Sequence, residues 1–529
     1  MDNKRRSVET NVADYIYFYN LGRKYIKSGD LERAEDCFRQ VLKLNNGYSE
    51  AYYHLGRIFF KRGKYEEAIK NYRRVIEIDP DHAKAYFSIG LIFQLHGKIR
   101  EAEKFYLKAI EMNPDFAEAY SNLSSIFCNK RDLGNALYYA VKSVRLQPQN
   151  PFSLNNLGKV YGYLYQYDKA VKFFKKAIEI KPDLVEAYSN LGSCYLNLRD
   201  IRKSLYFTEK ALSLNPNFVE ARCNRGFIYL TLGEYEKGWQ DYEWRWYRKE
   251  FEKIKRDFSK PIWNGEDIVN KTLFVFAEQG FGDTIQFCRF LKIARKKVGK
   301  LIFEVPSALK KIIDFCEGAD LVIKSGERIP DFDFYIPLLS LPRVLNIKLQ
   351  DVYTGIPYLS VKRDDLARNS ILSKYKDKFK IGFVWAGNRE HLNDLNRSID
   401  VTYFIRLTDV PNVQLFSLQK NPSEADCLKL RENGKIVDLN EYINDFYDTA
   451  IFIKNMDLVV SADTAVAHLA GAIGKNVWLL LPYNSDWRWL LDGEDSPWYP
   501  TMRIFRQKKL GNWENVFDNV FTELKKLIK

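Results

Sequence analysis

The sequence predicts an α + α/β protein, in which an all-α repeat solenoid is followed by two α/β lobes. A similar segment returns every 34 residues in the first half, as from Ala51 to Ala85. In the second half, short apolar runs alternate with helical segments, and this alternation occurs in two successive sets. A chain of 529 residues exceeds one ordinary core, so we expect several domains.

The repeat is defined by small residues on two helices and by a proline after the second helix. Its copies begin at Tyr17, Ala51, Ala85, Ala119, Ser153, Ala187 and Ala221. The small residues on the first helix are Gly22, Gly56, Gly90, Ser124, Gly158, Gly192 and Gly226. Those on the second helix are Ala34, Ala68, Ala102, Ala136, Ala170, Ser204 and Gly238. The prolines are Pro80, Pro114, Pro148, Pro182 and Pro216.

Small residues let the two helices of a copy approach closely, and proline ends the second helix. One helix pair cannot bury its apolar face alone, so the pairs must stack into a solenoid. The pattern resembles the tetratricopeptide repeat, which implies protein or peptide binding and no catalysis.

One polar position recurs two residues before the glycine of the first helix. It reads Asn20, His54, Ser88, Asn122, Asn156, Asn190 and Asn224 along the chain. A carboxamide offers donors and an acceptor, so a row of them can hold an extended chain by its backbone. The row resembles the asparagine ladder in the solenoids of protein O-GlcNAc transferases, which makes Asn122, Asn156, Asn190 and Asn224 candidate acceptor-binding residues. The alternative is that asparagine is merely common beside this glycine.

The repeat pattern ends after Gly238, and a segment rich in aromatic residues follows. Trp239, Trp244 and Trp246 have near-helical spacing, and we expect them to pack the last helix on the next domain, with ligand contact as the alternative. We therefore predict a solenoid over residues 1–246 and a junction over residues 247–270.

Two sets of strand-like runs follow the junction, in lobes predicted at residues 271–375 and 376–529. The runs are KTLFVFAEQG, KLIFEVP and DFDFYIP in the first set, and KIGFVWAG, NVQLFSLQ, KIVDL, MDLVVSA and NVWLLLP in the second. The segment GDTIQFCRFLKIARKKVG reads as a helix. Strands alternating with helices indicate parallel sheets with ligands at the carboxyl ends of the strands. Two such sets predict two Rossmann-like lobes with a cleft between them.

The first motif with chemical potential is AEQGFGDTIQF, where a strand turns into a helix. Gly280 and Gly282 allow close approach of backbone N–H groups to a ligand. Asp283 begins the helix, where it acts either as an N-cap or as a general base facing the cleft.

The second motif is DLVVSADTAVAHLAGAIGKNVWLLLPYNSDWRW, residues 457–489, in which a strand ends and Asp463 and Thr464 begin a helix. The free N–H groups of Thr464, Ala465 and Val466 and the positive end of the helix dipole favour an anion such as a diphosphate. Asp463 suits a cap or a hydroxyl ligand better than a phosphate contact. His468 lies one turn into the helix and is a candidate catalytic residue, with a structural role as the alternative.

The third motif is the loop FVWAGNREHLNDLNRSID, which follows a strand and is therefore a binding loop by default. Asn388 and Arg397 are its candidate donor-binding residues, and Arg397 can supply the cation that a metal-free phosphate site needs. His391 is a further candidate. Gln419 and Lys420 follow the next strand and are expected to meet the nucleotide.

Three bulk properties restrict the class of protein. The net charge is +14, but lysine and arginine are interleaved with acids, which indicates solvated helix faces more than nucleic-acid binding. The seven cysteines form no CxxC pair, so neither a disulfide framework nor a zinc site is supported. The polar start MDNKRRSVET and the lack of a long apolar run predict no signal peptide and no membrane span. We expect a cytoplasmic protein.

The second half resembles the heptosyltransferases of lipopolysaccharide synthesis, which have the glycosyltransferase B fold. The motifs DTAVAHLAGAIGK and GFGD carry this resemblance. The whole chain is similar to bacterial tetratricopeptide–glycosyltransferase fusions, including those implicated in flagellin glycosylation. The resemblance implies an acceptor lobe at residues 271–375 and a nucleotide-sugar lobe at residues 376–529. It also implies that Asp283 is the base, that Asp463, Thr464 and Ala465 bind the donor phosphates, and that Arg397 replaces a lysine of the family.

The resulting hypothesis is a metal-independent, inverting transfer of sugar from a nucleotide sugar to a hydroxyl of a protein held by the solenoid. The nucleotide sugar is a co-substrate, and no cofactor is expected. The acid pair at Asp331 and Asp333 is interpreted as a strand end, not as a metal site. Alternatives are a non-catalytic adaptor that binds a nucleotide sugar, a transferase acting on glycan or lipid, and a nucleic-acid binder. The sequence leaves open the sugar, the nucleotide, the acceptor protein, the retaining or inverting outcome and the oligomeric state.

Overall fold

The computed structural model describes residues 2–353, 355–363, 365, 370–389 and 393–528. It contains two compact units, Met1–Cys194 and Tyr195–Lys529. Among the described helices, none combines the length and the apolar character that a membrane crossing requires.

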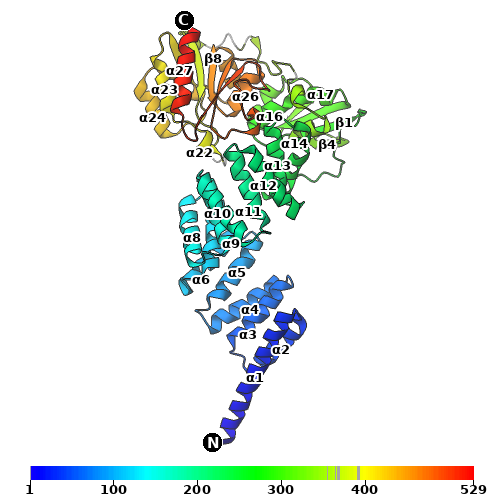
Figure 1. Cartoon of the computed structure of the whole chain (residues 1–529). Coiled ribbons are helices and arrows are strands. Elements are labelled where there is room, and N and C mark those ends of the chain that lie inside the picture. Colours follow the sequence, from blue (N-terminus) through cyan, green and yellow to red (C-terminus); the bar gives the residue numbers. More distant parts are fainter. Residues whose placement is uncertain (1, 354, 364, 366–369, 390–392, 529) are drawn as a thin grey trace. The chain divides into compact units, whose positions relative to one another are not determined.

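The first unit consists of helices that follow one another as antiparallel pairs (Figure 1). They are α1 (Asp2–Ser28), α2 (Leu31–Leu44), α3 (Ser49–Lys61), α4 (Tyr65–Ile78), α5 (Ala83–Leu95), α6 (Ile99–Met112), α7 (Ala117–Asn129), α8 (Leu133–Leu146), α9 (Pro151–Tyr163), α10 (Tyr167–Ile180) and α11 (Val185–Asn197), the last of which crosses into the second unit. The predicted helical repeat is confirmed.

Close approach within each pair depends on the small residues of the repeat. A Cβ atom added at Gly56 would lie 2.6 Å from Cε1 of Tyr72, and one at Gly90 would lie 2.8 Å from Cε1 of Tyr106. Ala68 and Ala102 on the second helices are fully buried. The glycine of one helix therefore leaves room for an aromatic ring of its partner, which tightens the pair.

The second unit begins with the last repeat helices, which lead into an α/β region. These helices are α12 (Ile201–Leu214), α13 (Val219–Thr231) and α14 (Tyr235–Tyr242), followed by the 3-10 turn η1 (Glu243–Tyr247) and α15 (Lys249–Glu252). The later α-helices are α16 (Phe281–Phe287), α17 (Leu291–Arg295), α18 (Lys310–Ile313), α19 (Leu341–Val344), α21 (Ser370–Ser373), α22 (Asp394–Arg397), α23 (Val401–Ile405), α24 (Glu424–Asn433), α25 (Phe446–Lys454), α26 (Ala465–Ala472) and α27 (Glu514–Ile528).

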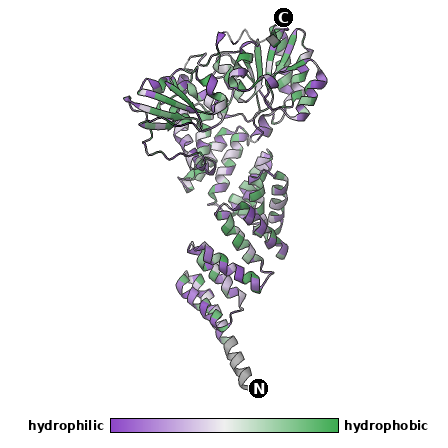
Figure 2. Cartoon of the chain, turned by 180° about the vertical axis from the view of Figure 1, so that it is seen from behind, coloured by the Kyte–Doolittle hydropathy of each residue, from purple (hydrophilic) through white to green (hydrophobic). Residues whose placement is uncertain are grey.

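Two parallel sheets form the centre of this region. The first has the order β3-β2-β1-β4, from β1 (Ile268–Phe276), β2 (Val298–Val305), β3 (Leu321–Lys324) and β4 (Phe334–Pro337). The second has the order β10-β9-β8-β5-β6-β7, from β5 (Phe379–Val384), β6 (Val413–Ser417), β7 (Ile436–Asp438), β8 (Leu458–Ala462), β9 (Val477–Leu481) and β10 (Met502–Arg506). Figure 2 shows these strands as largely hydrophobic, as expected of parallel strands covered on both faces.

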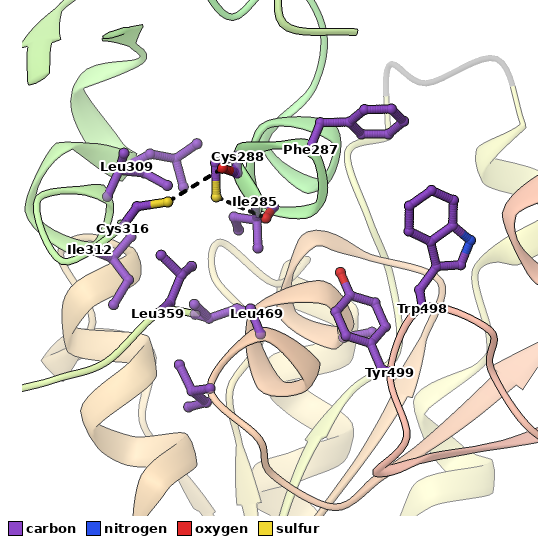
Figure 3. Packing of buried hydrophobic residues seen from close by; sticks show 14 of the residues in the cluster. Ile285, Phe287, Cys288, Leu309, Ile312, Cys316, Leu359, Leu469, Trp498 and Tyr499 are labelled. Carbon is purple, nitrogen blue, oxygen red and sulfur yellow. Dashed lines mark hydrogen bonds between the residues drawn. The ribbon is translucent and has the colours of Figure 1, made fainter. Parts of the chain in front are cut away.

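The two sheets share one buried apolar cluster, which also includes α14 of the last repeat. Figure 3 shows part of this cluster, where Ile285 of α16 and Ile312 of α18 lie near Leu359. Leu469 of α26 lies beside these residues. Burial of side chains from both lobes in one cluster removes apolar surface from water and fixes the lobes against each other.

Several predicted boundaries differ from the structure. The helix predicted at residues 282–299 is interrupted by a 3-10 turn at Cys288–Phe290, and its end belongs to β2, which begins at Val298. Strands β3 and β10 were not predicted, because the short runs LVIK and MRIFR have no long apolar pattern.

The predicted solenoid over residues 1–246 spans both compact units, because the repeat helices continue to Tyr242 whereas the second unit begins at Tyr195. The reason lies in the junction, where the Trp239 indole donates a hydrogen bond of 2.9 Å from Nε1 to the Ile347 carbonyl. Trp239 also packs on Trp487, with ring centroids 5.4 Å apart. The predicted packing role of Trp239 is confirmed, and the last repeats belong structurally to the α/β region.

We expect two glycines of α9 to respond oppositely to alanine. A Cβ atom at Gly158 would lie 2.7 Å from Cε1 of Phe174, whereas one at Gly162 would lie 4.0 Å from the nearest atom, Sγ of Cys194. Gly158→Ala should destabilise the solenoid by about 1–3 kcal/mol because of overpacking. Gly162→Ala should stabilise it by about 0.4–1 kcal/mol, since it restricts the unfolded chain. Urea unfolding followed by helical circular dichroism measures both, and equal shifts would contradict the packing argument.

Candidate functional site

A cavity of about 950 Å³ lies in the second unit, where the carboxyl ends of strands from both sheets meet. Its wall comes from segments that follow β1, β5, β6, β8 and β9, and from the last repeat through Phe227 and Tyr242. The volume lies in the range of small-molecule sites. The candidate residues of the second half that line it are Gly280, Gly282, Asp283, Asn388, Arg397, Gln419, Lys420, Asp463, Thr464, Ala465 and His468. His391 lies outside the described residues.

Asp283 stands at the start of α16 with both carboxylate oxygens in use. Oδ2 accepts a hydrogen bond of 3.0 Å from the N–H of Gly280, which is the N-cap residue of the helix. Oδ1 accepts a hydrogen bond from Nη2 of Arg488. The predicted N-cap role of Asp283 is therefore wrong, because Asp283 is the third residue of the helix and caps it only by accepting from the Gly280 N–H. The general-base role stays a prediction, and the carboxylate has further lone pairs that can accept a proton.

The starts of α16 and α26 lie against each other, so both motifs face the same cavity. A Cβ atom at Gly282 would lie 3.5 Å from the Ala465 Cα atom and 3.0 Å from Cδ2 of His468. A methyl group at this position would crowd the His468 ring, which would have to shift slightly. Gly282 is thus explained by the contact between two helices.

Helix α26 begins at Ala465 and has Thr464 as its N-cap residue. The Thr464 hydroxyl does not cap the helix and lies 3.2 Å from the Ser461 hydroxyl. The first N–H groups of a helix have no partner within that helix, and the dipole makes this end positive. The N-terminal end of α26 therefore presents donors to an anion in the cavity.

Asp463 lies beside this helix end with an unusual charge environment. Its Oδ2 accepts a hydrogen bond of 3.0 Å from the Trp489 indole. Burial and, next, the nearby Asp486 raise the pKa of Asp463 to about 6, against the lowering effect of the Trp489 hydrogen bond. Its charge consequently changes near pH 6, and its side chain acts as an acceptor for Trp489. The predicted contact of Asp463 with the donor phosphates stays a prediction.

His468 is a buried, neutral histidine on the cavity wall. Burial, together with the charges of Arg488 and Arg289, holds the pKa of His468 well below its usual value. Nδ1 lies 3.0 Å from the Tyr499 hydroxyl, and the ring stacks on Trp489 with centroids 5.3 Å apart. These contacts agree with a structural role for His468, and its catalytic role stays a prediction.

The remaining candidate residues line the opposite strand ends. Arg397 donates from Nη1 to the Asp463 carbonyl oxygen at 3.3 Å, and its buried Nε has no hydrogen-bond partner among the described residues. Buried Gln419 accepts a hydrogen bond of 3.1 Å from the Ala386 N–H. Lys420 is exposed, and its Nζ donates to the Asn440 carbonyl at 3.1 Å. Asn388 and Arg389 are exposed at the rim.

Sequence reasoning missed Arg488, which is the best-connected cation of the cavity. Its Nε donates to Oε1 of Gln286 at 2.7 Å, its Nη1 to Oδ1 of Asp486 at 2.8 Å, and its Nη2 to Asp283. The guanidinium also lies over the Trp487 ring, 4.4 Å from its centroid. The segment SDWRW follows β9, so the rule that ligands bind after strand ends was a usable signal.

The repeat asparagines make contacts between neighbouring repeats. Asn156 donates from Nδ2 to the Ser121 hydroxyl at 2.8 Å, and Asn190 donates to Oδ1 of Asn155 at 3.0 Å. Asn122 forms a hydrogen bond with Tyr106. These half-buried side chains therefore have a structural role, and each amide keeps further hydrogen-bonding capacity.

Asp333 lies outside the cavity wall. It accepts a hydrogen bond of 2.9 Å from the Thr272 N–H and pairs with Lys271. Its place beside β1 agrees with the predicted strand end.

Comparisons with known proteins identify the repeat. Family models described as TPR repeat and tetratricopeptide repeat match residues 15–48, 56–97, 83–116, 105–138, 151–184, 185–218 and 207–240. The chain therefore carries tetratricopeptide repeats in its N-terminal region.

A curated relative, Protein FlbA of Caulobacter vibrioides, is 24% identical over 323 residues, which cover 55% of this chain and 53% of FlbA. The chain thus spans about half the length of that relative. A tetratricopeptide repeat protein from Parabacteroides merdae is 16% identical, with a TM-score of 0.38, over 46% of this chain and 96% of that one. PilF of Pseudomonas aeruginosa is 17% identical, with a TM-score of 0.37, over 40% and 97%.

We expect anion binding in the cavity to weaken as the pH rises through about 6. Asp463 is neutral below its raised pKa and becomes negative above it, beside the helix end that would hold the anion. His468 is neutral throughout this range because its pKa is lowered. A nucleotide sugar keeps the charge of its diphosphate here, so calorimetric titration at pH 5 and pH 7.5 should show severalfold weaker binding at the higher pH. Asp463→Asn should remove this dependence, and a dependence unchanged in that variant would exclude Asp463 as its source.

Proposed function

We propose that this chain is a cytoplasmic, metal-independent glycosyltransferase with the glycosyltransferase B fold. It would move a sugar from a nucleotide sugar to a hydroxyl of a protein, such as a flagellin, that the repeats hold. The observation that carries the proposal is the shared cavity, in which the Asp283 carboxylate and the N-terminal end of α26 line one space of about 950 Å³. A sugar diphosphate needs a base on one side of its anomeric carbon and an anion site on the other.

The anion site is supported by three groups around α26. Its N-terminal N–H groups stabilise the developing negative charge on the leaving diphosphate. Arg397 lies beside them and brings a fixed positive charge. His468 adds a donor: if the Tyr499 hydroxyl donates to Nδ1, the proton of the neutral ring is on Nε2, whose edge faces Gly282.

Asp283 is the proposed base. The acceptor oxygen attacks the anomeric carbon while the bond from that carbon to the diphosphate oxygen breaks, and the hydroxyl proton passes to Asp283. Direct displacement of this kind inverts the anomeric carbon. The ion pair with Arg488 and the Gly280 N–H orient the carboxylate for this transfer.

A protein acceptor is supported by the contribution of the repeats to the cavity. Phe227 and Tyr242 belong to the last repeat and line the same space as Asp283. The Tyr242 hydroxyl accepts a hydrogen bond of 2.9 Å from Nε2 of Gln279, one residue before Gly280. A polypeptide segment bound at this last repeat would therefore lie beside the base.

Asp283→Asn should reduce sugar transfer about a hundredfold to ten-thousandfold, because the amide cannot accept the proton. Binding of the nucleotide sugar should survive, since the anion site is intact. The measurement is mass spectrometry of candidate flagellins incubated with a panel of nucleotide sugars. Asp333→Asn, at a carboxylate outside the cavity, is the matched control and should retain transfer. Transfer by Asp283→Asn at the wild-type rate would remove this residue from the role.

Replacing the four ladder asparagines by alanine together should lower sugar transfer to the protein acceptor, while hydrolysis of the nucleotide sugar continues. The four residues are Asn122, Asn156, Asn190 and Asn224. The amides would no longer hold the acceptor backbone, but the cavity would be unaltered. Because Asn156 and Asn190 also bridge repeats, circular dichroism must first establish that the helices remain. If a folded variant glycosylates the protein acceptor as the wild type does, these four asparagines do not bind the acceptor.

One observation favours a second candidate function, a non-catalytic adaptor that binds a nucleotide sugar. Both oxygens of Asp283 already have protein partners, so the carboxylate is also explained as a structural cap and ion-pair partner. The two functions differ in turnover. Hydrolysis or transfer of a nucleotide sugar by the purified chain supports the enzyme, whereas tight binding without turnover supports the adaptor.

A further inference from the structure

The loop that follows β9 carries the cavity residues that join the two lobes. We define the β9 loop as residues 483–492. Asp486, Trp487 and Arg488 at its centre line the cavity, and Arg488 forms the ion pair with Asp283. The position of this loop therefore determines where the Asp283 carboxylate is held.

The backbone of the β9 loop is strained immediately after these residues. Leu490 has φ 56° and ψ −175°, a conformation that belongs almost only to glycine. A leucine keeps such a conformation only when its surroundings enforce it. Within the C-terminal lobe, Arg506 contributes by donating to the Trp489 carbonyl at 3.0 Å and to the Ser485 hydroxyl. The α/β region adds hydrogen bonds from the Tyr483 N–H to Oε1 of Gln507 at 3.1 Å and from Nε1 of Trp498 to the Arg488 carbonyl at 2.9 Å.

Further restraints on the loop come from the repeats. Nη2 of Arg199 donates to the Leu491 carbonyl in a short hydrogen bond and to Oδ1 of Asp492 at 2.6 Å. The same guanidinium lies over the Tyr483 ring, 5.3 Å from its centroid. At the start of the loop, Nδ2 of Asn484 donates to Oδ1 of Asn197 at 2.7 Å. Residues from the end of α11 and the turn after it thus hold both ends of the β9 loop.

Arg199 occupies a position at which the repeat favours glycine. The turn between the two helices of each repeat contains one residue with positive φ, and these residues are spaced 34 apart: Gly29, Gly63, Gly97, Arg131, Tyr165, Arg199 and Gly233. The φ angle of Arg199 is 61°, and that of Arg131 is 63°. An arginine there carries a conformational cost that glycine avoids. At position 199 its side chain provides the contacts to the β9 loop that glycine cannot make.

We propose that Arg199 is a positioning residue that holds the β9 loop in the conformation that places Arg488 on Asp283. The last repeats would then be part of the catalytic apparatus as well as of the acceptor-binding surface. The catalytic part of this inference rests on the proposed transferase function, whereas the positioning of the loop does not.

The test compares three variants of the full chain. Arg199→Gly removes the contacts and relieves the positive φ, so its melting temperature should equal or exceed that of the wild type. Arg131→Gly is the matched control, because it makes the same backbone change at an exposed arginine of the other compact unit. Arg199→Lys keeps a cation and should restore the contacts in part, since an ammonium cannot reproduce the fork of the guanidinium.

Hydrogen–deuterium exchange of peptides covering residues 483–492 measures how often the backbone of the β9 loop opens. We expect faster exchange in Arg199→Gly, an intermediate rate in Arg199→Lys and the wild-type rate in Arg131→Gly. In transfer assays with UDP-, GDP-, CDP- and dTDP-sugars, kcat of Arg199→Gly should fall about a hundredfold, as expected for a misplaced catalytic group. KM for the nucleotide sugar should change far less, because α26 is untouched.

Equal exchange of the loop in Arg199→Gly and the wild type would overturn the inference, whatever the activities are. If Arg199→Gly shows faster loop exchange but keeps the wild-type kcat, the catalytic part of the inference is wrong. A third outcome is faster loop exchange in Arg199→Gly together with no turnover of any nucleotide sugar by the wild-type chain. That outcome would support the positioning role of Arg199 and reject the transferase function.

Discussion

The ion pair between Arg488 and Asp283 is the interaction on which the candidate site depends. It joins the segment after β9 of one sheet to the helix after β1 of the other, and both side chains line the cavity. A buried arginine is costly unless its donors are satisfied, and here Gln286, Asp486 and Asp283 share them. Loss of Gln286 would leave a buried donor unsatisfied, and loss of either carboxylate would remove part of the charge compensation. The two lobes are therefore tied together at the point where we propose that the chemistry occurs.

A second polar chain behind the cavity supports the same junction. Arg289, after α16, donates to the Val352 and Trp498 carbonyls and to the Tyr358 hydroxyl, each at 2.9 Å. Tyr358 lies 3.4 Å from Tyr499, which in turn contacts His468. Arg289 has no carboxylate partner among the described residues, and the rings of Tyr358 and Tyr499 lie under its guanidinium. His468 is thus oriented through buried groups of both lobes, which explains how a neutral histidine keeps a defined place in the wall.

The repeats and the α/β region are more than neighbours in the chain. Trp239 enters the apolar cluster of the lobes, Tyr242 contacts Gln279, and Arg199 holds the β9 loop. A repeat array that only recruited a partner would not need to supply such contacts. Their presence favours a protein in which recognition by the repeats and the geometry of the cavity depend on each other, either in a transferase or in an adaptor.

The sequence alone determined the local features. The period of 34 residues followed from small residues and prolines, since close helix packing requires them at fixed positions. The cavity residues Asp283, Asp463 and Thr464 were predictable because parallel strands end at one edge, so the turns after different strands meet there. The tertiary structure decided the rest. Arg488 and Asp283 are 205 residues apart, and no periodicity links them. The strain at Leu490, the use of Arg199 in place of a turn glycine and the division of the chain at Cys194 likewise depend on contacts between distant segments, which local patterns do not encode.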